Sequence, residues 1–332
     1  MNLISRLSLL EQLKNYILSD NESWQEAKEK AFNANAWFIP QFINLSINNI
    51  ANDFLAHDKL GSWIQKHNIP GDTLQPKKVG IVMAGNIPMV GFHDMLAVFI
   101  AGHYSIIKLS SKDNVLIKHL VEEMLKWEPE TNKYFEIAST LKGCDADIAT
   151  GSNNSSRYFD YYFQKYPHII RRNRTSVAIL TGNETKDDLE KLADDVHLYF
   201  GLGCRNVTKV YVPLNYDSQN LLDALKKYDF FMDHFKYKNN FDYMFSIHLL
   251  NQTKYMTNGN VLLVEEPSLF SPISQLNFEY YSNLDAVKKS LTNNDQLQCK
   301  VGGGGIPFGQ AQCPGLSDYA DGVDTLAFLK TL

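Results

Sequence analysis

The chain has 332 residues, of which 44% are hydrophobic and 12% aromatic, and its formal net charge is −5. This composition is typical of a folded protein with more than one core, and it excludes an intrinsically disordered chain. The basic residues are scattered along the sequence, so the clustered positive charge of a nucleic-acid-binding surface is missing. No stretch reaches the roughly 18 consecutive apolar residues of a membrane-spanning helix, so we expect no transmembrane segment.

The four cysteines, at positions 144, 204, 299 and 313, form no closely spaced pair. No secretory signal peptide is recognised, so we expect reduced thiols and a cytoplasmic location. The nine histidines show no spacing typical of metal ligands, and we therefore expect no metal ion.

The first 68 residues are expected to be helical, with a break at Pro40. Leu3, Leu7 and Leu10 begin a run of apolar residues at helical spacing. This run favours a packed amphipathic helix over a helix lying on a membrane surface.

From residue 79 onward, predicted strands alternate with predicted helices. We expect strands at residues 79–84, 104–109, 147–150 and 176–180, and helices at residues 88–101, 113–127 and 153–164. Asp113 is expected near the N-cap of its helix. This alternation is typical of βαβ units and a parallel sheet, so the predicted fold class is α/β.

After residue 180 the alternation becomes less regular. We expect helices at residues 187–199, 216–228 and 284–291 and strands at residues 207–212 and 261–264, whereas residues 240–251 are ambiguous. The four glycines at residues 302–305 indicate either a flexible hinge or a site of close backbone approach.

One cysteine has a setting that suits a nucleophile. Cys204 follows Gly203 and precedes Arg205, between a predicted helix and a predicted strand. Glycines allow close backbone approach, and an adjacent cation favours the thiolate, which is the reactive form of the side chain. A lone cysteine is also commonly a small buried hydrophobic residue, so these residues alone leave both interpretations open.

Three further stretches place polar residues after a predicted strand, where ligands bind in open α/β sheets. Asn86 could donate its amide to a developing oxyanion or cap the following helix. Lys108, followed by Ser110, could hold the ribose of a nucleotide or be a solvated strand end. Gly151 and Ser152 could form a phosphate site at a helix N-terminus or an ordinary turn. The usual glycine-rich nucleotide-binding fingerprints are absent.

Taken in this order, these stretches resemble the motifs of the aldehyde dehydrogenase superfamily, from about residue 78 to the C-terminus. The resemblance implies that Asn86, in Asn-Ile-Pro, helps to form an oxyanion hole. It implies that Lys108 contacts the adenosine ribose and that Cys204 is the nucleophile.

The remaining motifs of the resemblance concern the cofactor. The Thr-Gly-Ser turn that contains Gly151 and Ser152 matches a turn near the cofactor phosphates. Phe270, in Phe-Ser-Pro, matches a phenylalanine that contacts the nicotinamide ribose. Residues 307–309, Pro-Phe-Gly, resemble the late motif of the superfamily.

Two departures from the superfamily pattern point to one branch. Residues 170–175 replace the usual Glu-Leu-Gly-Gly stretch, so the glutamate that activates the hydrolytic water has no counterpart. Ser268 stands where a second glutamate would hold the nicotinamide ribose. With these departures, residues 201–206 and 308–314 resemble the LuxC-type acyl-CoA reductases. Reduction of a thioester needs no water-activating base, so the missing glutamate agrees with this resemblance.

The resemblance implies two Rossmann-type parallel-sheet domains and a helical N-terminal segment. We expect residues 1–175 to form this segment and the cofactor-binding domain, with residues 305–332 returning to it. Residues 176–304 are expected to form the catalytic domain that carries Cys204.

The implied reaction is the NADPH-dependent reduction of an acyl-CoA, or another acyl thioester, to an aldehyde through an acyl-enzyme. Lys108 and Lys112 flank Ser110, and their charges favour NADPH because they could meet a ribose 2′-phosphate. A homodimer is the expected assembly. An acyltransferase, an acylating aldehyde dehydrogenase for short-chain acyl-CoA and an inactive scaffold stay open as alternatives. Aromatic residues between 231 and 256 fit either an acyl tunnel or a packed core.

Overall fold

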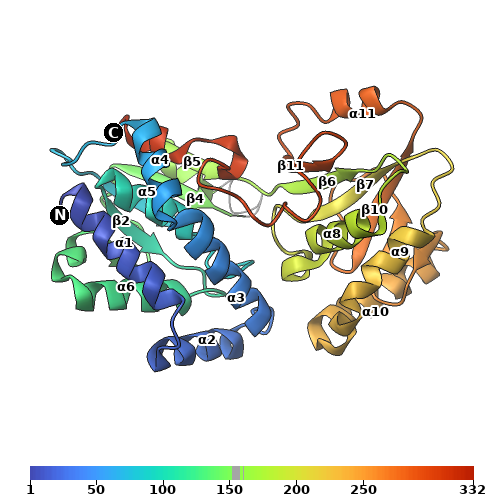
Figure 1. The fold of residues 1–332 in the computed structure, drawn as a ribbon, viewed down its shortest axis with the longest axis horizontal. Coiled ribbons are helices and arrows are strands. Elements are labelled where there is room, and N and C mark those ends of the chain that lie inside the picture. Colours follow the sequence, from blue (N-terminus) through green and yellow to red (C-terminus); the bar gives the residue numbers. More distant parts are fainter. Residues whose placement is uncertain (152–157, 160) are drawn as a thin grey trace. The chain divides into compact units, whose positions relative to one another are not determined.

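The structure is a computed structural model of the chain, and it describes residues 1–151, 158–159 and 161–332. The described chain forms two compact units (Figure 1). The first unit contains Met1–Asn173 and Pro314–Leu332, and the second contains Arg174–Cys313. The division expected after residues 175 and 304, with its cofactor-binding and catalytic roles, stays a prediction.

Four helices precede the first strand, and they confirm the predicted helical region. They are α1 (Leu3–Ile17), α2 (Glu22–Ala34), α3 (Pro40–Asn49) and α4 (His57–His67), with a π-helical segment at Ile50–Phe54. Asn2 and Asn21 cap α1 and α2 through their side-chain oxygens. Pro40 starts α3 at a position where its missing N–H is not needed. Helix α1 buries its apolar face and is therefore a packed helix.

A five-stranded parallel sheet forms the centre of the first unit. Its strands are β1 (Lys78–Val82), β2 (Tyr104–Lys108), β3 (Phe135–Ile137), β4 (Ala146–Thr150) and β5 (His168–Arg171). Their order is β3-β2-β1-β4-β5, so the direction of the winding reverses between β1 and β4. In open parallel sheets, ligands bind beyond the carboxyl ends of the strands beside such a reversal.

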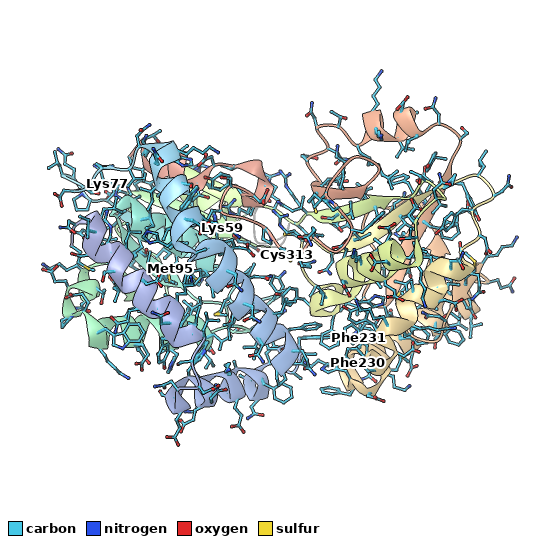
Figure 2. All side chains as sticks on the ribbon, viewed as in Figure 1. Lys59, Lys77, Met95, Phe230, Phe231 and Cys313 are labelled. Carbon is cyan, nitrogen blue, oxygen red and sulfur yellow. The ribbon has the colours of Figure 1, made fainter. Side chains whose placement is uncertain are left out.

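Two helices connect the first strands of this sheet, α5 (Phe92–Ala101) and α6 (Leu116–Trp127). Almost every residue of α5 is buried, including Met95, because α5 lies against β1 and β2 and is covered by α1 and α12 (Thr325–Leu329) (Figure 2). The last segment of the chain therefore completes the core of the first unit.

The second unit is built on a six-stranded sheet in the order β11-β6-β7-β10-β9-β8. Its strands are β6 (Thr175–Ile179), β7 (Val207–Pro213), β8 (Tyr255–Thr257), β9 (Leu262–Glu265), β10 (Gln275–Tyr281) and β11 (Leu297–Gly302). Only the pairing of β8 with β9 is antiparallel among the described strands. The predicted α/β fold with two parallel-sheet units is thus confirmed.

The helices of the second unit are α8 (Lys186–His197), α9 (Gln219–Leu225), α10 (Phe235–Leu250) and α11 (Leu284–Ser290). Helices α8 and α9 lie together on one face of the sheet, and α11 lies on the other (Figure 1). Val287 of α11 packs with Val177 and Ile179 of β6. No helix in the described ranges is long and apolar enough to cross a membrane.

Several elements differ from the sequence-based expectation. Helix α5 begins at Phe92 rather than at residue 88, because the chain makes a turn at residues 88–91. The ambiguous residues 240–251 belong almost entirely to α10. Strands β10 and β11 were not expected, and β10 carries buried polar residues that hide its apolar pattern. Half of the helix predicted at residues 153–164 lies outside the described residues, and residues 158–159 and 161–163 are helical as expected.

The glycine-rich segment at residues 302–305 is a site of close backbone approach. Gly302 has a φ of 65°, and a Cβ there would lie 2.7 Å from the carbonyl oxygen of Ile179. A Cβ on Gly305 would lie 2.2 Å from the carbonyl oxygen of Lys300. Any side chain at these two positions would therefore clash with backbone.

Candidate functional site

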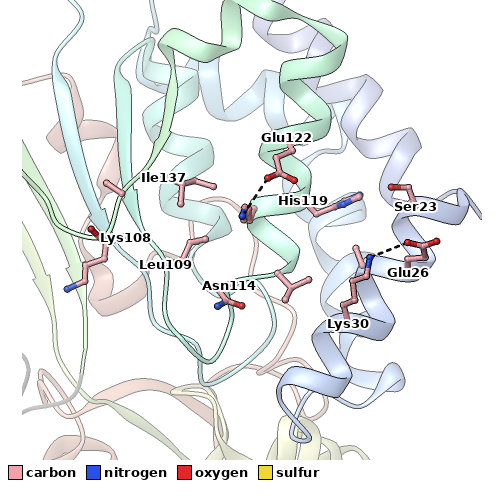
Figure 3. Close-up of a pocket in the computed structure, with 14 residues that line it drawn as sticks. Ser23, Glu26, Lys30, Lys108, Leu109, Asn114, His119, Glu122 and Ile137 are labelled. Atoms are coloured by element: carbon pink, nitrogen blue, oxygen red, sulfur yellow. Dashed lines mark hydrogen bonds and ion pairs between the residues drawn. The ribbon is translucent and has the colours of Figure 1, made fainter.

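A pocket of about 610 Å³ lies in the first unit, at the carboxyl ends of β2 and β3 (Figure 3). Leu109, Val115 and Ile137 give it apolar surface, and Asn114 and Lys108 give it polar groups. Helix α6 and helix α2 of the N-terminal segment form its other walls. The pocket therefore lies at the carboxyl edge of the sheet, beside β2 and β3, whereas the reversal of the winding lies between β1 and β4.

Three lysines line this pocket, and two of them have carboxylate partners. On α2, Lys30 lies 3.2 Å from Glu26, and on α6, Lys118 lies 3.8 Å from Glu122 (Figure 3). Lys108 forms no ion pair with any residue that the structure describes, and its side chain extends away from α2 and α6 (Figure 3). Lys108 is thus the one lysine of the pocket lining that has no carboxylate partner among the described residues.

A stack of three rings supports the α6 side of the pocket. The His119 ring lies 5.9 Å from the Tyr16 ring and 5.5 Å from the Trp24 ring, and both pairs are stacked. Nε2 of His119 lies 2.7 Å from the Tyr16 hydroxyl. Burial lowers the pKa of His119, so the ring is neutral near pH 7. Of the three rings, His119 lines the pocket, and Tyr16 and Trp24 hold it in place from behind.

Asn86 lies in the loop between β1 and α5, beside the strand that ends in Lys108. The N–H of Met83, just after β1, donates to the carbonyl of Lys108 at 3.0 Å. Lys108 and the start of the loop that leads to Asn86 therefore lie at the same edge of the sheet. The N-cap of α5 is Gly91, and no described side chain caps this helix. The alternative that Asn86 caps the following helix is therefore wrong. Asn86 is half-buried at the carboxyl end of β1.

The other predicted cofactor residues of the first unit have defined surroundings. Ser110 Oγ accepts the N–H of Lys112 at 3.2 Å, and Ser110 is not part of the pocket lining. Gly151 ends β4, and its N–H donates to the carbonyl of Arg171 at 3.3 Å. Ser152 lies outside the described residues. The roles of Ser110, Gly151 and Ser152 in cofactor binding stay predictions.

In the second unit, Cys204 follows a strained turn. Helix α8 ends at His197, and Tyr199, Phe200 and Gly201 then adopt φ values of 56°, 56° and 74°. Left-handed conformations are rare for aromatic residues and persist only where packing fixes them. The Phe200 ring supplies such packing, since it lies 4.3 Å from the Phe231 ring. The thiol of Cys204 is half-buried and forms no disulfide.

Asn206 is the residue that holds the Cys204 loop. It is fully buried, its Oδ1 accepts the N–H of Gly203 at 2.7 Å, and its Nδ2 donates to the carbonyls of Asp195, Val196 and Leu198. These bonds tie the loop to the last turn of α8. On the other side of the loop, Ser176 Oγ donates to the Cys204 carbonyl at 3.1 Å.

Asp195 connects the Pro-Phe-Gly segment to the same helix. Its two carboxylate oxygens accept the N–H groups of Gly309 at 2.7 Å and Ala311 at 2.9 Å. Burial raises the pKa of Asp195 to about 6, and the two hydrogen bonds partly oppose this effect. Since Asn206 binds the carbonyl of the same residue, Asp195 joins the Cys204 loop to residues 309–311.

The loop that carries Phe270 returns to the amino end of β7, next to the Cys204 loop. Thr208 Oγ1 donates to the carbonyl of Leu269 at 2.6 Å, and Lys209 Nζ donates to the carbonyl of Pro267 at 2.7 Å. Asn277 Nδ2 donates to the carbonyl of Phe270 at 3.2 Å. Within the second unit, the structure therefore brings the Cys204 and Phe270 loops together at the start of β7.

Residues 170–175 serve a structural purpose in the described chain. Arg171 is 2% exposed, and its guanidinium binds Asp94 of α5 at 2.6 Å and the Thr325 hydroxyl at 2.8 Å. This stretch thus supplies a buried ion pair where the resemblance would place a catalytic glutamate. Among the described residues, no three His, Cys, Asp or Glu side chains are grouped as metal ligands would be.

The aromatic residues considered for an acyl tunnel divide into two groups. Phe231 and Phe241 are buried in the core of the second unit, whereas Phe235 and Tyr243 are largely exposed (Figure 2). The packed-core interpretation is therefore confirmed for Phe231 and Phe241.

Comparison with known families identifies the chain. Residues 47–229, more than half of the sequence, match the family described as acyl-CoA reductase (LuxC). The protein belongs to the LuxC acyl-CoA reductase family. It is accordingly an oxidoreductase that acts on acyl or aldehyde groups. No curated protein matches this LuxC-family sequence significantly.

Solved structures resemble this LuxC-family chain in fold. Aldehyde dehydrogenase 21 from Physcomitrella patens, in complex with succinate, has a TM-score of 0.68 at 13% identity, and the match covers 91% of this chain and 73% of that one. An aldehyde dehydrogenase from Mycobacterium tuberculosis, complexed with NAD+, has a TM-score of 0.65 at 10% identity over 91% and 73% of the two chains. Succinic semialdehyde dehydrogenase from Streptococcus pyogenes, in complex with NADP+, has a TM-score of 0.61 at 13% identity over 90% and 76%. At these identities the likeness shows the aldehyde dehydrogenase fold.

The sequence pointed to Asn86, Lys108 and Cys204 as candidates, but it gave little sign of the residues that hold the neighbouring loops. Asp195 and Ser176 lie in ordinary helix and strand patterns that carry no local signal of their contacts. Asn206 had one signal, its place at the end of the Gly-Leu-Gly-Cys-Arg-Asn stretch.

Proposed function

We propose that this protein reduces an acyl-CoA thioester to an aldehyde with NADPH, through an acyl-enzyme on Cys204. The observation that carries the proposal is the Cys204 loop. A half-buried thiol in a chain of the LuxC family stands at the start of β7, on a turn held by Asn206 and Ser176. Such fixed placement of a nucleophile lowers the entropic part of the barrier to its attack.

The chemistry follows from the thiolate of Cys204. Its sulfur attacks the thioester carbonyl carbon, and the tetrahedral species collapses as the bond to the CoA sulfur breaks. CoA leaves as a thiolate, and the acyl group stays on Cys204. When bound, the nicotinamide cofactor supplies the hydride that reduces this acyl group. The thiohemiacetal then releases the aldehyde, and Cys204 leaves as a thiolate.

Asn86 is proposed to donate its side-chain amide to the oxyanion of both tetrahedral species. A fixed donor of this kind strengthens as negative charge develops on the oxygen. Asn86 belongs to the first unit and Cys204 to the second, so their joint action is part of the proposal. Its support is the position of Asn86 at the carboxyl end of β1, with the helix-cap alternative removed.

The pocket at the ends of β2 and β3 is proposed to hold the adenosine part of NADPH. Leu109, Val115 and Ile137 offer surface for an adenine ring. Lys108 is proposed to meet the ribose and its 2′-phosphate by charge-assisted hydrogen bonds. Lys112, expected to share this role, is not part of the lining. These residues fit an adenosine phosphate in size, polarity and charge.

The test of the function combines NADPH consumption with acyl labelling. Wild-type enzyme should consume NADPH in the presence of acyl-CoAs of increasing chain length, and radiolabelled acyl-CoA should label the protein when NADPH is omitted. Cys204→Ala should abolish both signals. Cys299→Ala is the matched control, because Cys299 is also half-buried and its Sγ lies 3.0 Å from Ser176 Oγ.

Two results would contradict parts of this proposal. Labelling that persists in Cys204→Ala but disappears in Cys299→Ala would assign the nucleophile to Cys299 instead. Labelling of wild-type enzyme without any consumption of NADPH would instead indicate an acyltransferase.

Cofactor preference is tested at Lys108. Lys108→Ala should raise the KM for NADPH more than the KM for NADH, because only NADPH carries the 2′-phosphate. Lys112→Ala, which changes a lysine outside the pocket lining, should change both values little. Equal changes for the two cofactors in Lys108→Ala would show that Lys108 does not contact the 2′-phosphate.

A further inference from the structure

The loop between β1 and α5, which carries Asn86, has a shape that its local sequence does not explain. Met89 in this loop adopts a φ of 54°, a left-handed conformation that residues other than glycine rarely adopt. Such a conformation persists only where the surrounding structure fixes it. The residues that fix Met89 therefore bear on the position of Asn86, three residues earlier in the chain.

Asp113 supplies the contact that fixes Met89. Its side chain is 5% exposed, and its Oδ2 accepts the N–H of Met89 at 2.7 Å. The sequence placed Asp113 near the N-cap of α6, and it does lie close to the N-cap, Val115, but no described side chain caps this helix. The carboxyl group of Asp113 binds the β1–α5 loop instead.

Two more contacts hold the same loop on both sides of Asn86. A Cβ on Gly85 would lie 2.6 Å from Ser110 Oγ and 3.1 Å from the Asp113 nitrogen, so the chain at Gly85 packs directly on the turn that carries Asp113. Ser46 of α3 donates its hydroxyl to the Pro88 carbonyl at 2.8 Å. The segment from Gly85 to Met89 is thus held at both of its ends.

We propose that Asp113 is a positioning residue that fixes the direction of the Asn86 amide. The proposal rests on the proposed function, in which Asn86 binds the oxyanion. A hydrogen-bond donor stabilises a transition state only when it is already oriented toward the charge that develops. Displacement of such a donor by about 1 Å can cost roughly 100-fold in rate.

The loop needs an acceptor at Asp113 rather than a negative charge. Burial raises the pKa of Asp113 to about 7, and the hydrogen bond from Met89 partly opposes this rise. A protonated carboxyl group still accepts the Met89 N–H through its carbonyl oxygen. Its other oxygen, Oδ1, has no hydrogen-bond partner among the described residues. Asp113→Asn should therefore keep the loop in place, because the amide oxygen still accepts the Met89 N–H. Asp113→Leu should not, because leucine has no acceptor.

The first experiment measures hydrogen exchange at the Met89 amide and single-turnover acylation from radiolabelled acyl-CoA. Asp113→Leu, which is similar in size and lacks an acceptor, should speed the exchange and slow acylation about 10- to 100-fold. Asp113→Asn should restore both values. The matched control is Asp147→Leu, because Asp147 of β4 is also a buried aspartate whose Oδ1 has no described partner. It should change neither value.

A double mutant separates positioning from general stability. If Asp113 acts through Asn86, the variant with both Asn86→Ala and Asp113→Leu should acylate no more slowly than Asn86→Ala alone. A double variant whose loss of acylation rate equals the product of the two single losses would overturn the inference. Faster exchange at Met89 in Asp113→Leu with a normal acylation rate would overturn it too.

The same variants distinguish this inference from the proposed function. A normal acylation rate in Asn86→Ala would remove the oxyanion role of Asn86, and the positioning role of Asp113 would fall with it. Slow acylation in Asn86→Ala together with a normal rate in Asp113→Leu would overturn the positioning role alone. Slow acylation in both, restored by Asp113→Asn, supports it.

Discussion

At the scale of single residues, buried polar side chains hold the loop that carries Asn86 and the loop that carries Cys204. Asn206 makes four hydrogen bonds to backbone groups without any exposure to solvent. Asp195 and Asp113 bind backbone N–H groups with their carboxylates. Buried polar groups are costly when they lose a partner, so each of these residues fixes its loop in one arrangement.

Asn206→Ala should lower the free energy of unfolding by about 3 kcal/mol, because it leaves the Gly203 N–H and three carbonyls without this partner. Asn283→Ala is a suitable control. Asn283 caps α11 through a single hydrogen bond to the Ala286 N–H, and its loss should cost about 1 kcal/mol. Urea unfolding of both variants measures the difference. Equal losses would show that Asn206 has no greater role than an ordinary cap.

Asn86→Ala should slow single-turnover acylation about 10²–10³-fold if its amide binds the oxyanion. The helix-cap cost of about 1 kcal/mol should not appear, because Gly91 is the N-cap of α5. The thermal midpoint and the acylation rate are measured on the same preparation. A folded variant that acylates at the wild-type rate would contradict the proposed role.

At the scale of elements, the end of α8 combines a strained turn with an aromatic cluster. The His197 ring is stacked on the Tyr228 ring at 4.8 Å, with 9° between their planes. The Nδ1 atom of His197 lies 3.2 Å from the Ala193 carbonyl, so the neutral ring can donate there. The cluster explains how Tyr199 and Phe200 are held in left-handed conformations directly before the Cys204 loop.

His197 gives this element a pH dependence. Burial lowers the pKa of His197 from 6.5 to about 4 in the folded protein. Its contribution to stability is therefore complete above pH 6.5 and is lost as the pH falls toward 4, by about 3 kcal/mol in all. Asp113 and Asp195, whose pKa values are raised by burial, act in the opposite direction over part of this range.

The effect of His197 is isolated by comparing wild type with His197→Phe, which keeps an aromatic ring. The difference in unfolding free energy between the two proteins should shift by about 3 kcal/mol in favour of the variant as the pH falls from 6.5 to 4. Urea unfolding across this range measures the shift. A difference that stays constant with pH would show that His197 does not titrate in this way.

At the scale of the whole molecule, a buried arginine, Arg171, links the C-terminal segment to the rest of the first unit. Arg171 of β5 contacts Asp94 of α5, Thr325 of α12 and the Ala320 carbonyl. Residues from three distant parts of the sequence thus meet at one guanidinium. The contact explains how residues 314–332 return to the first unit after the chain has built the second.

Arg171→Met should destabilise the protein by about 3–5 kcal/mol, because it leaves the Asp94 carboxylate buried without its cation. The double variant Arg171→Met with Asp94→Leu should be less destabilised than Arg171→Met alone, since both charges are then gone. Urea unfolding and hydrogen exchange of residues 314–332 measure the two effects. Destabilisation of the double variant by the sum of the single effects would contradict coupling of the pair.

Much of the fold could be predicted from the sequence, but strand and helix limits could not. Strands β1, β2 and β6 each contain a short apolar stretch with few polar residues, and such stretches indicate a buried strand directly from the sequence. Strand β10 was missed because Gln275 and Asn277 are polar and yet buried by contacts with distant residues. Helix α5 starts late because Asp113, 24 residues further on, stabilises the turn at Met89.

The sequence by itself determined the α/β class, the helical N-terminal segment and the order of motifs that contains Asn86, Lys108 and Cys204. These features depend on local periodicity and on motif order, both of which are written along the chain. The tertiary structure alone decided that Asp113 binds the Asn86 loop rather than capping α6, that Asn206 holds the Cys204 loop, and that Asp195 binds residues 309–311. A buried polar side chain satisfies its hydrogen bonds with whichever backbone groups the fold brings beside it, and their identity depends on packing between distant segments.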